Sequence, residues 1–313
     1  MKVGFIGVGT MGRHMAANLQ KSGHALVVND ARKEAAASHL ANGAAWADSP
    51  QAVAQQADIV FTSLPGPVEV EAVALGDKGL LAGMSAGKVF FDLSTNSPTV
   101  MRRIHAAFET QGVHVLDAPV SGGPRGAESG KLAIWVGGDE GIFTKCKPVL
   151  DGFSDQAVYV GPIGAGSIAK LVHNCAGYMI QTAMAEVFTM GVKAGVDPLA
   201  IWKAVRQGAR GRVRTFDSLA DNFLPGKYDP PSFALRLAHK DVTLATQLAH
   251  EVKVPMRLAQ LTLQEMTEAL NRGWGERDSR VAMLLQNERA GVDINVDAAA
   301  LKAVLDAEKG ARS

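Results

Sequence analysis

The sequence predicts an α/β protein. Its N-terminal domain holds a doubly wound, mostly parallel sheet, and a long helix joins it to an all-helical C-terminal domain. Short apolar segments typical of buried strands alternate with helical segments up to about residue 160. A glycine-rich turn directly follows the first of these strands. Beyond residue 163 the hydrophobic periodicity is helical throughout. We therefore place the domains at residues 1–162 and 163–313.

The glycine-rich turn is the first candidate site. Apolar residues from Val3 to Ile6 run straight into G-x-G-x-x-G, and helical spacing continues from there to Gly23. Such a turn lets the backbone approach a pyrophosphate, and the following helix points its N-terminus at the anion. This order indicates a Rossmann dinucleotide site; the alternative is an ordinary strand-to-helix turn. The predicted cofactor-binding residues of the turn are Gly7, Gly9, Thr10, Met11 and Gly12.

An acidic residue follows the second strand, Ala25–Asn29. Asp30 lies about 20 residues after the glycines, where a carboxylate binds the ribose hydroxyls of NAD. The alternative is that Asp30 is a turn residue. Nearby Arg32 would also suit the 2′-phosphate of NADP. We therefore predict NAD as the cofactor and keep NADP as the alternative.

Further strands end where a ligand would lie. A helix is expected at 32–41, a short strand at 44–46 and a helix capped by Ser49, before the buried strands Asp58–Leu64 and Lys88–Leu93. Open α/β sheets bind ligands at the carboxyl ends of their strands. We therefore predict that three residues at these ends contact the cofactor, with a plain loop hydroxyl as the alternative for the threonine. They are Leu64, Pro65 and Thr95.

A second glycine-rich segment, DAPVSGGPRGAESGKL, starts at the end of the strand Val113–Asp117 and precedes the strand Leu132–Val136. Such a segment can turn successive backbone N–H groups toward a carboxylate, or it can be a flexible connector. Its candidate anion-binding residues are Ser121, Gly122 and Gly123. A helix at 139–150 and a strand at 157–160 complete the domain.

The linking helix is predicted from about Ala165 to Lys193, roughly 40 Å at 1.5 Å per residue. Apolar residues cover most of its circumference, as in a helix buried on nearly all sides. Lys170 and Asn174 stand four residues apart and so share one side. They indicate either a polar pocket or a snorkelling lysine beside a locally bonded amide.

The remaining chain is expected to be helical at 198–207, 218–222, 233–253, 256–272, 279–288 and 296–311. Lys240 and Asp241 are either a functional pair or a solvated one. Four arginines lie between Val205 and Phe216, a pattern that is most often solvated or interfacial. They are Arg206, Arg210, Arg212 and Arg214.

Composition excludes several functions. With 32 basic and 31 acidic residues the net charge is +1, so neither nucleic acid nor an anionic membrane is expected as a partner. No apolar run reaches the length of a membrane span. Cys146 and Cys175 form no CxxC motif, which favours buried thiols in a reducing compartment, and no metal-ligand set is predicted. Because the first strand begins at Lys2, no signal peptide is expected, and the predicted location is cytoplasmic.

Four separated motifs together resemble the β-hydroxyacid dehydrogenases, the 3-hydroxyisobutyrate dehydrogenase family. GFIGVGTMGRHMAANL resembles the family's dinucleotide signature and DAPVSGGPRGAESGKL its substrate loop. GAGSIAKLVHN resembles the catalytic motif and HKDVTLA the late cofactor motif. The resemblance extends to about Val292. It implies a Rossmann domain, a long linking helix and a helical domain that often forms homodimers or homotetramers.

The resemblance also implies site roles and a small carboxylate substrate, a β-hydroxy acid or its semialdehyde. Lys170 would be the general acid–base, and Asn174 would hold the substrate oxygen. Ser121, Gly122 and Gly123 would bind the carboxylate. Pro65, Thr95 and Lys240 would contact the cofactor. Two alternatives on the same fold are an imine reductase and a non-catalytic cofactor-bound scaffold. Lys170 argues against the first, and Lys170 with Asn174 argues against the second.

One segment departs from the family pattern. Where many members have an Ala-Ser type of segment, this chain has Gly208 to Arg212. Arg210 and Arg212 would suit a second acidic group, as in members that act on dicarboxylates such as 2-(hydroxymethyl)glutarate. The alternative is that these arginines face solvent or a neighbouring subunit.

Overall fold

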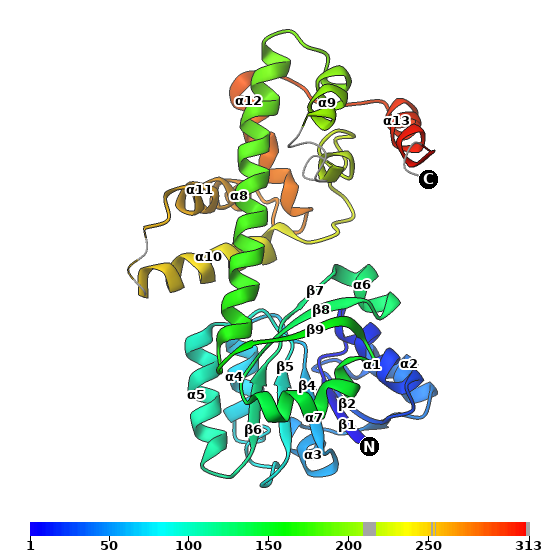
Figure 1. Ribbon diagram of the computed structural model, residues 1–313, viewed down its shortest axis with the longest axis vertical. Helices are drawn as coiled ribbons and strands as arrows, with labels where there is room; N and C mark the ends of the chain where they lie inside the picture. The colour runs from blue at the N-terminus through cyan, green and yellow to red at the C-terminus, as the bar shows by residue number, and fades with distance from the viewer. Residues whose placement is uncertain (209–216, 252, 254, 311–313) are drawn as a thin grey trace. The chain divides into compact units, whose positions relative to one another are not determined.

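The computed structural model describes residues 1–208, 217–251, 253 and 255–310. The chain divides into two compact units, Met1–Val172 and His173–Ser313, called here the N-terminal and the C-terminal unit (Figure 1). The helix α8, Ala165–Lys193, is continuous, so its first two turns belong to the N-terminal unit and the rest to the C-terminal unit. Its bounds are those predicted from the sequence.

The N-terminal unit is built on one sheet with the strand order β3-β2-β1-β4-β5-β6-β8-β7, and β9 pairs with β8. Neighbours from β3 to β6 are parallel, as are β8 and β9, whereas β6 and β7 pair with β8 antiparallel. The predicted doubly wound, mostly parallel sheet is confirmed. The strands are β1 (Lys2–Ile6), β2 (Ala25–Asn29), β3 (Ala45–Trp46), β4 (Ile59–Thr62), β5 (Val89–Asp92), β6 (His114–Asp117), β7 (Val120–Ser121), β8 (Leu132–Gly137) and β9 (Ser154–Gly161).

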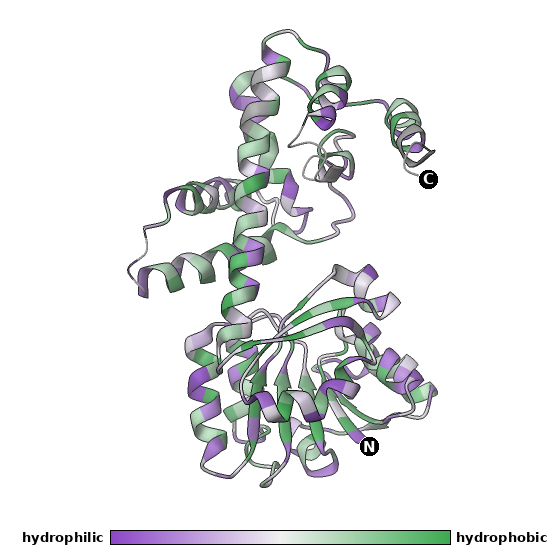
Figure 2. Ribbon diagram, viewed as in Figure 1, coloured by the Kyte–Doolittle hydropathy of each residue, from purple (hydrophilic) through white to green (hydrophobic). Residues whose placement is uncertain are grey.

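Helices cover both faces of this sheet, so its strands are apolar at consecutive positions (Figure 2). On one face Phe61 stacks on Phe91 with ring centroids 5.4 Å apart, in a core shared with α1, α6 and α7. On the other, Val60 and Phe90 pack against α3, α4 and α5. The helices of this unit are α1 (Gly12–Lys21), η1 (Lys33–Ala36), α2 (Ala37–Ala41), α3 (Pro50–Gln56), α4 (Pro67–Leu75), α5 (Pro98–Glu109), α6 (Gly123–Ser129) and α7 (Glu140–Leu150).

The second glycine-rich segment differs from the predicted loop, because it contains the short strand β7 and the helix α6. Gly122 and Gly123 have positive φ angles of 134° and 61°, which turn the chain between these elements. Pro124 then stands in the first helical turn, where its missing N–H costs nothing. The Asn18 side chain on α1 donates to the Ala127 carbonyl at 2.8 Å and holds α6 in place.

The C-terminal unit is helical, as predicted. Phe188 of α8 packs edge-on against Phe223, in a core that also contains Trp202. Its elements after α8 are α9 (Pro198–Gln207), η3 (Asp217–Ala220), α10 (Leu235–Glu251), α11 (Arg257–Asn271), η4 (Ser279–Met283), α12 (Leu284–Ala290) and α13 (Ala298–Gly310). Within the described ranges, none of the helices is both long and apolar enough to cross a membrane.

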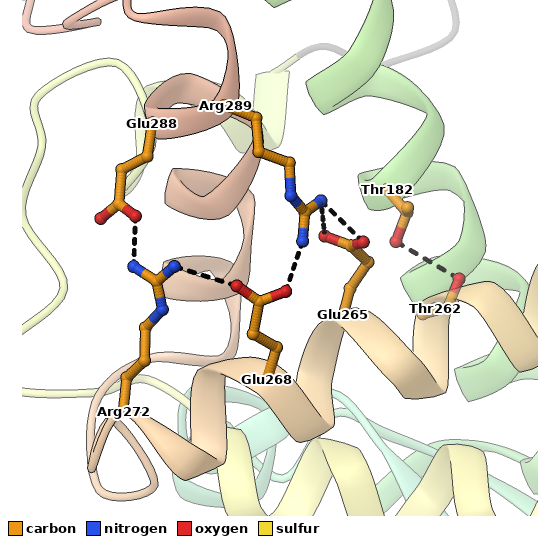
Figure 3. Close-up of polar contacts among 7 residues, drawn as sticks. All are labelled: Thr182, Thr262, Glu265, Glu268, Arg272, Glu288 and Arg289. Atoms are coloured by element: carbon orange, nitrogen blue, oxygen red, sulfur yellow. Dashed lines mark hydrogen bonds and ion pairs between the residues drawn. The ribbon is translucent and has the colours of Figure 1, made fainter.

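An exposed ion-pair network ties α11 to α12 (Figure 3). Arg289 pairs with Glu265 and Glu268, each at 2.6 Å, and Arg272 pairs with Glu268 at 2.9 Å and with Glu288. The Glu268 carboxylate, shared by Arg272 and Arg289, makes this a network rather than isolated surface pairs, which contribute little. The network therefore fixes the two helices against each other.

Candidate functional site

The first glycine-rich turn has the shape that a dinucleotide needs. A Cβ at Gly7 would overlap the Ser63 carbonyl, and one at Gly12 would overlap the Gly7 carbonyl. By contrast, a Cβ at Gly9 would meet no atom within 4 Å. Packing of β1, β4 and α1 therefore requires Gly7 and Gly12, whereas Gly9 leaves open space beside the turn. A pyrophosphate would approach the backbone on that open side.

Asp30 is bonded to the same turn. Its Oδ2 accepts the Val8 N–H at 2.9 Å, and its Oδ1 accepts the Arg32 N–H at 2.9 Å. The carboxylate thus stands at the carboxyl end of β2, directly beside the predicted pyrophosphate site. Arg32 and Lys33 follow it and are exposed, and the Lys33 ammonium lies 5.4 Å from the centre of the Trp46 ring.

A buried carboxylate network holds the ends of β4 and β5. Asp92 Oδ1 accepts from the Thr62 hydroxyl at 2.8 Å, and its Oδ2 accepts from the Asn96 amide at 2.8 Å. The Ser94 hydroxyl accepts the Leu64 N–H at 2.9 Å. Burial raises the pKa of Asp92, and the hydrogen bonds from Ser94, Asn96 and Thr62 oppose that shift.

The network positions the two loops that carry Pro65 and Thr95, the predicted cofactor contacts. Sequence reasoning did not find its central residue. The available signal was an aspartate at the end of an otherwise apolar strand, in the segment KVFFDL.

Lys170 reaches the second glycine-rich segment. Its Nζ donates to the Val120 carbonyl at 2.8 Å, next to Ser121, and the lysine is half-buried. Gly122 and Gly123 are exposed, and a Cβ at Gly123 would meet no atom within 4 Å. The N-terminal unit thus brings the predicted proton carrier next to the predicted carboxylate loop.

Asn174, one turn further along α8, is bonded to a buried acid in the C-terminal unit. Its Nδ2 donates to Asp241 Oδ2 at 2.6 Å. Lys240 Nζ lies 3.1 Å from Asp241 Oδ1. The Asp241 side chain is 1% exposed and that of Lys240 is 27% exposed. The alternative prediction, a pair of solvated side chains, is therefore wrong for Asp241. Burial raises the pKa of Tyr178 well above its ordinary value, and the negative charge of Asp241 adds to the shift.

The structure describes only one of the four arginines between Val205 and Phe216. Arg206 is buried on α9, and its guanidinium lies 4.4 Å from the centre of the Trp202 ring, so it belongs to the helical core. Arg210, Arg212 and Arg214 lie outside the described residues.

The sheet order, the glycine turn at β1 and the acid at the end of β2 define a dinucleotide-binding protein of the Rossmann class. Two family models match the chain. Residues 2–161 match the NAD binding domain of 6-phosphogluconate dehydrogenase, and residues 164–286 match the NAD-binding domain of NADP-dependent 3-hydroxyisobutyrate dehydrogenase.

Named relatives agree. The chain is 34% identical to 2-(hydroxymethyl)glutarate dehydrogenase of Eubacterium barkeri, over 94% of this chain and 98% of the relative. It is 33% identical to NAD-dependent L-serine dehydrogenase of Pseudomonas aeruginosa, over 93% and 99%. The solved 3-hydroxyisobutyrate dehydrogenase of Mycobacterium tuberculosis with L-serine superimposes with a TM-score of 0.82 at 28% identity, covering 91% of this chain and 98% of that one.

The chain therefore belongs to the β-hydroxyacid dehydrogenase family, and it is an NAD(P)-dependent oxidoreductase that acts on the hydroxyl group of hydroxy acids. The resemblance inferred from the four motifs is confirmed.

Proposed function

We propose that the protein oxidises the β-hydroxyl of a small hydroxy carboxylic acid, or reduces the matching semialdehyde, with Lys170 as the general acid–base. The observation that carries the proposal is the bond from Lys170 Nζ to the Val120 carbonyl, which places the amine beside the Ser121–Gly123 loop. The bound nicotinamide supplies or accepts the hydride. In oxidation the neutral amine takes the hydroxyl proton, and in reduction the ammonium returns it to the carbonyl oxygen.

The Ser121–Gly123 loop would hold the substrate carboxylate. Positive φ angles at Gly122 and Gly123 turn consecutive backbone N–H groups, as in an anion-binding nest, and both residues are exposed. The Ser121 hydroxyl adds a donor. A carboxylate held here would present the β-carbon of the substrate near Lys170.

Asn174 would orient the reacting oxygen. Because a carboxylate only accepts, the bond to Asp241 fixes which end of the amide faces it. One Nδ2 hydrogen and the Oδ1 atom are then available to a substrate hydroxyl or carbonyl. Lys240, held by Asp241, would contact the cofactor.

We propose NAD rather than NADP as the preferred cofactor. Asp30 carries its charge at the end of β2, where it would bond a ribose diol and repel a 2′-phosphate.

We also propose a cytoplasmic homodimer or homotetramer. Helices of the C-terminal unit expose three large apolar side chains that an interface between copies would cover, namely Ile180, Leu258 and Leu261. Analytical ultracentrifugation would measure the state, and a monomer at micromolar concentration would contradict this proposal.

The test of the function is a substrate panel with a matched variant, followed by nicotinamide absorbance. 3-Hydroxyisobutyrate, L-serine and 2-(hydroxymethyl)glutarate are compared with analogues that lack the carboxylate. Lys170→Met should retain NAD binding and lose at least the roughly 10²–10⁴-fold that general acid–base catalysis supplies. Lys147→Met, which removes a partly exposed lysine of α7 that pairs with Asp151, should leave turnover unchanged. Near-normal turnover of Lys170→Met would refute the mechanism.

A further inference from the structure

Asp117, the last residue of β6, is fully buried and bonded to the start of α8. Its Oδ1 accepts the Gly164 N–H at 2.7 Å, and its Oδ2 accepts the Ser167 N–H at 2.5 Å. The first N–H groups of a helix have no partner within the helix, so a carboxylate there satisfies them and favours the positive end of the helix dipole. Asp117 therefore caps α8 from a strand 47 residues earlier in the chain.

The backbone packs closely around this contact at Gly137 and Gly166. A Cβ at Gly137, which pairs with Asp117 across β6 and β8, would lie 2.5 Å from Asp117 Oδ1 and 2.8 Å from the Gly166 nitrogen. A Cβ at Gly166 would lie 2.6 Å from the Asp117 carbonyl oxygen. Backbone atoms of two strands and the helix therefore meet directly around this carboxylate.

The start of β7, just after this strand end, makes a second bond to α8, one turn further along the helix. Lys170 is three residues after Ser167, and its Nζ donates to the carbonyl of Val120, three residues after Asp117. Hydrogen bonds at both ends of the segment from Asp117 to Val120 therefore join it to the first turns of α8. Ser121 directly follows this segment.

We infer that Asp117 is a positioning residue that sets the location of Lys170 relative to the Ser121–Gly123 loop. The inference rests on the proposed function, because it assigns to Asp117 the alignment of the proton carrier with the carboxylate loop. Asp117 acts through α8 and does not touch the substrate. A displacement of about 1 Å at such a site costs on the order of 10²-fold in rate.

The carboxylate form is what the site requires. Both side-chain oxygens accept from backbone N–H groups, which favours the carboxylate, whereas burial raises the pKa of Asp117. An asparagine has the same shape, but it offers one acceptor oxygen and turns an NH₂ group toward the other donor. Asp117→Asn should therefore break one of the two bonds without creating a cavity.

The experiment compares Asp117→Asn with Asp139→Asn. Asp139 caps α7 in the same unit with a 2.8 Å bond to the Ile142 N–H, and it is exposed. For Asp117→Asn we expect kcat to fall about 10- to 100-fold, with the KM for NAD within twofold of the parent. We also expect its solvent deuterium isotope effect on kcat to rise, because the proton transfer becomes slower. Asp139→Asn should keep the parental kcat and isotope effect.

A second variant covers the case in which Asp117→Asn does not fold. Gly164 has a φ of +92°, so Gly164→Ala strains the helix start and shifts the N–H that Asp117 accepts, while no charge is lost. It should show the same pattern with a smaller decrease in kcat.

The positioning role alone would be overturned if folded Asp117→Asn or Gly164→Ala kept the parental kcat and isotope effect. Lys170→Met would be inactive in that case. An equal decrease in Asp139→Asn would also overturn it. Activity of Lys170→Met would overturn the proposed function, and this inference with it.

Discussion

The amide of Asn174 donates to the buried carboxylate of Asp241 at 2.6 Å, across 67 residues of sequence. The bond joins α8 to α10 within the C-terminal unit. Asp241 also pairs with Lys240, so one acid orients two side chains that are expected to act in the reaction. This gives Asp241 a role that its place in the HKDVTLA motif alone did not indicate.

Asp241→Asn should lower kcat/KM about 10- to 100-fold, because two amides facing each other no longer fix the orientation of Asn174. Stability should fall by about 1–3 kcal/mol, since a charge-assisted bond to Asn174 becomes a neutral one and the Lys240 ammonium loses its carboxylate partner. Steady-state kinetics and urea unfolding measure the two effects. Lys240→Met is the matched comparison: it removes the ion pair, keeps the bond to Asn174 and should act mainly on the KM for the cofactor. If folded Asp241→Asn kept the parental kcat/KM, Asp241 would not be needed to orient Asn174.

Asp30→Asn should reduce the preference for NAD over NADP about 10- to 100-fold, because a neutral amide neither repels a 2′-phosphate nor makes a charge-assisted bond to the ribose. An asparagine keeps an acceptor oxygen for the Val8 N–H, so the glycine turn retains its shape. Specificity constants for both cofactors give the preference. A parent enzyme that already prefers NADP would contradict the assignment of Asp30.

The sequence predicted the elements well where a local pattern determines them. The helix α8 follows from an apolar run flanked by glycines, and the sheet follows from apolar strands with helices between them. It could not predict β7 and α6, because glycine and proline obscure the hydrophobic period there. Nor could it identify Asp92 or Asp117 as organising residues, and Asp241 was left open. The bonds of Asp117 and Asp241 span many residues, as from Asp117 to Gly164, and at the end of an apolar strand an aspartate is typical of any strand terminus.

Acid should destabilise the protein partly through His39. The ring is buried, with Nδ1 3.0 Å from the Gln20 Oε1, and burial lowers the pKa of His39 below its ordinary value of 6.5. The unfolded chain therefore binds the proton more readily, so this contribution is fully present above pH 6.5 and decreases as the pH falls below it. Between pH 7 and 5 the Tm of His39→Gln should fall less than that of the parent, and His250→Gln, at an exposed position, should follow the parent. Equal slopes for all three proteins would exclude His39.

Arg210 and Arg212 give the sharpest test of substrate class. In the proposed site, Lys170 and the Ser121–Gly123 loop would account for one hydroxyl and one carboxylate, and Arg210 and Arg212 are proposed to bind a second anion. A charge-assisted bond contributes about 1.5–3 kcal/mol, so each alanine variant should lose about 10- to 100-fold in kcat/KM. The loss should be confined to dicarboxylate substrates such as 2-(hydroxymethyl)glutarate, with 3-hydroxyisobutyrate unaffected. Arg257→Ala, at an exposed position on α11, controls for the loss of one positive charge. Equal effects on both substrates, or none on either, would assign these arginines to solvent or to a subunit interface.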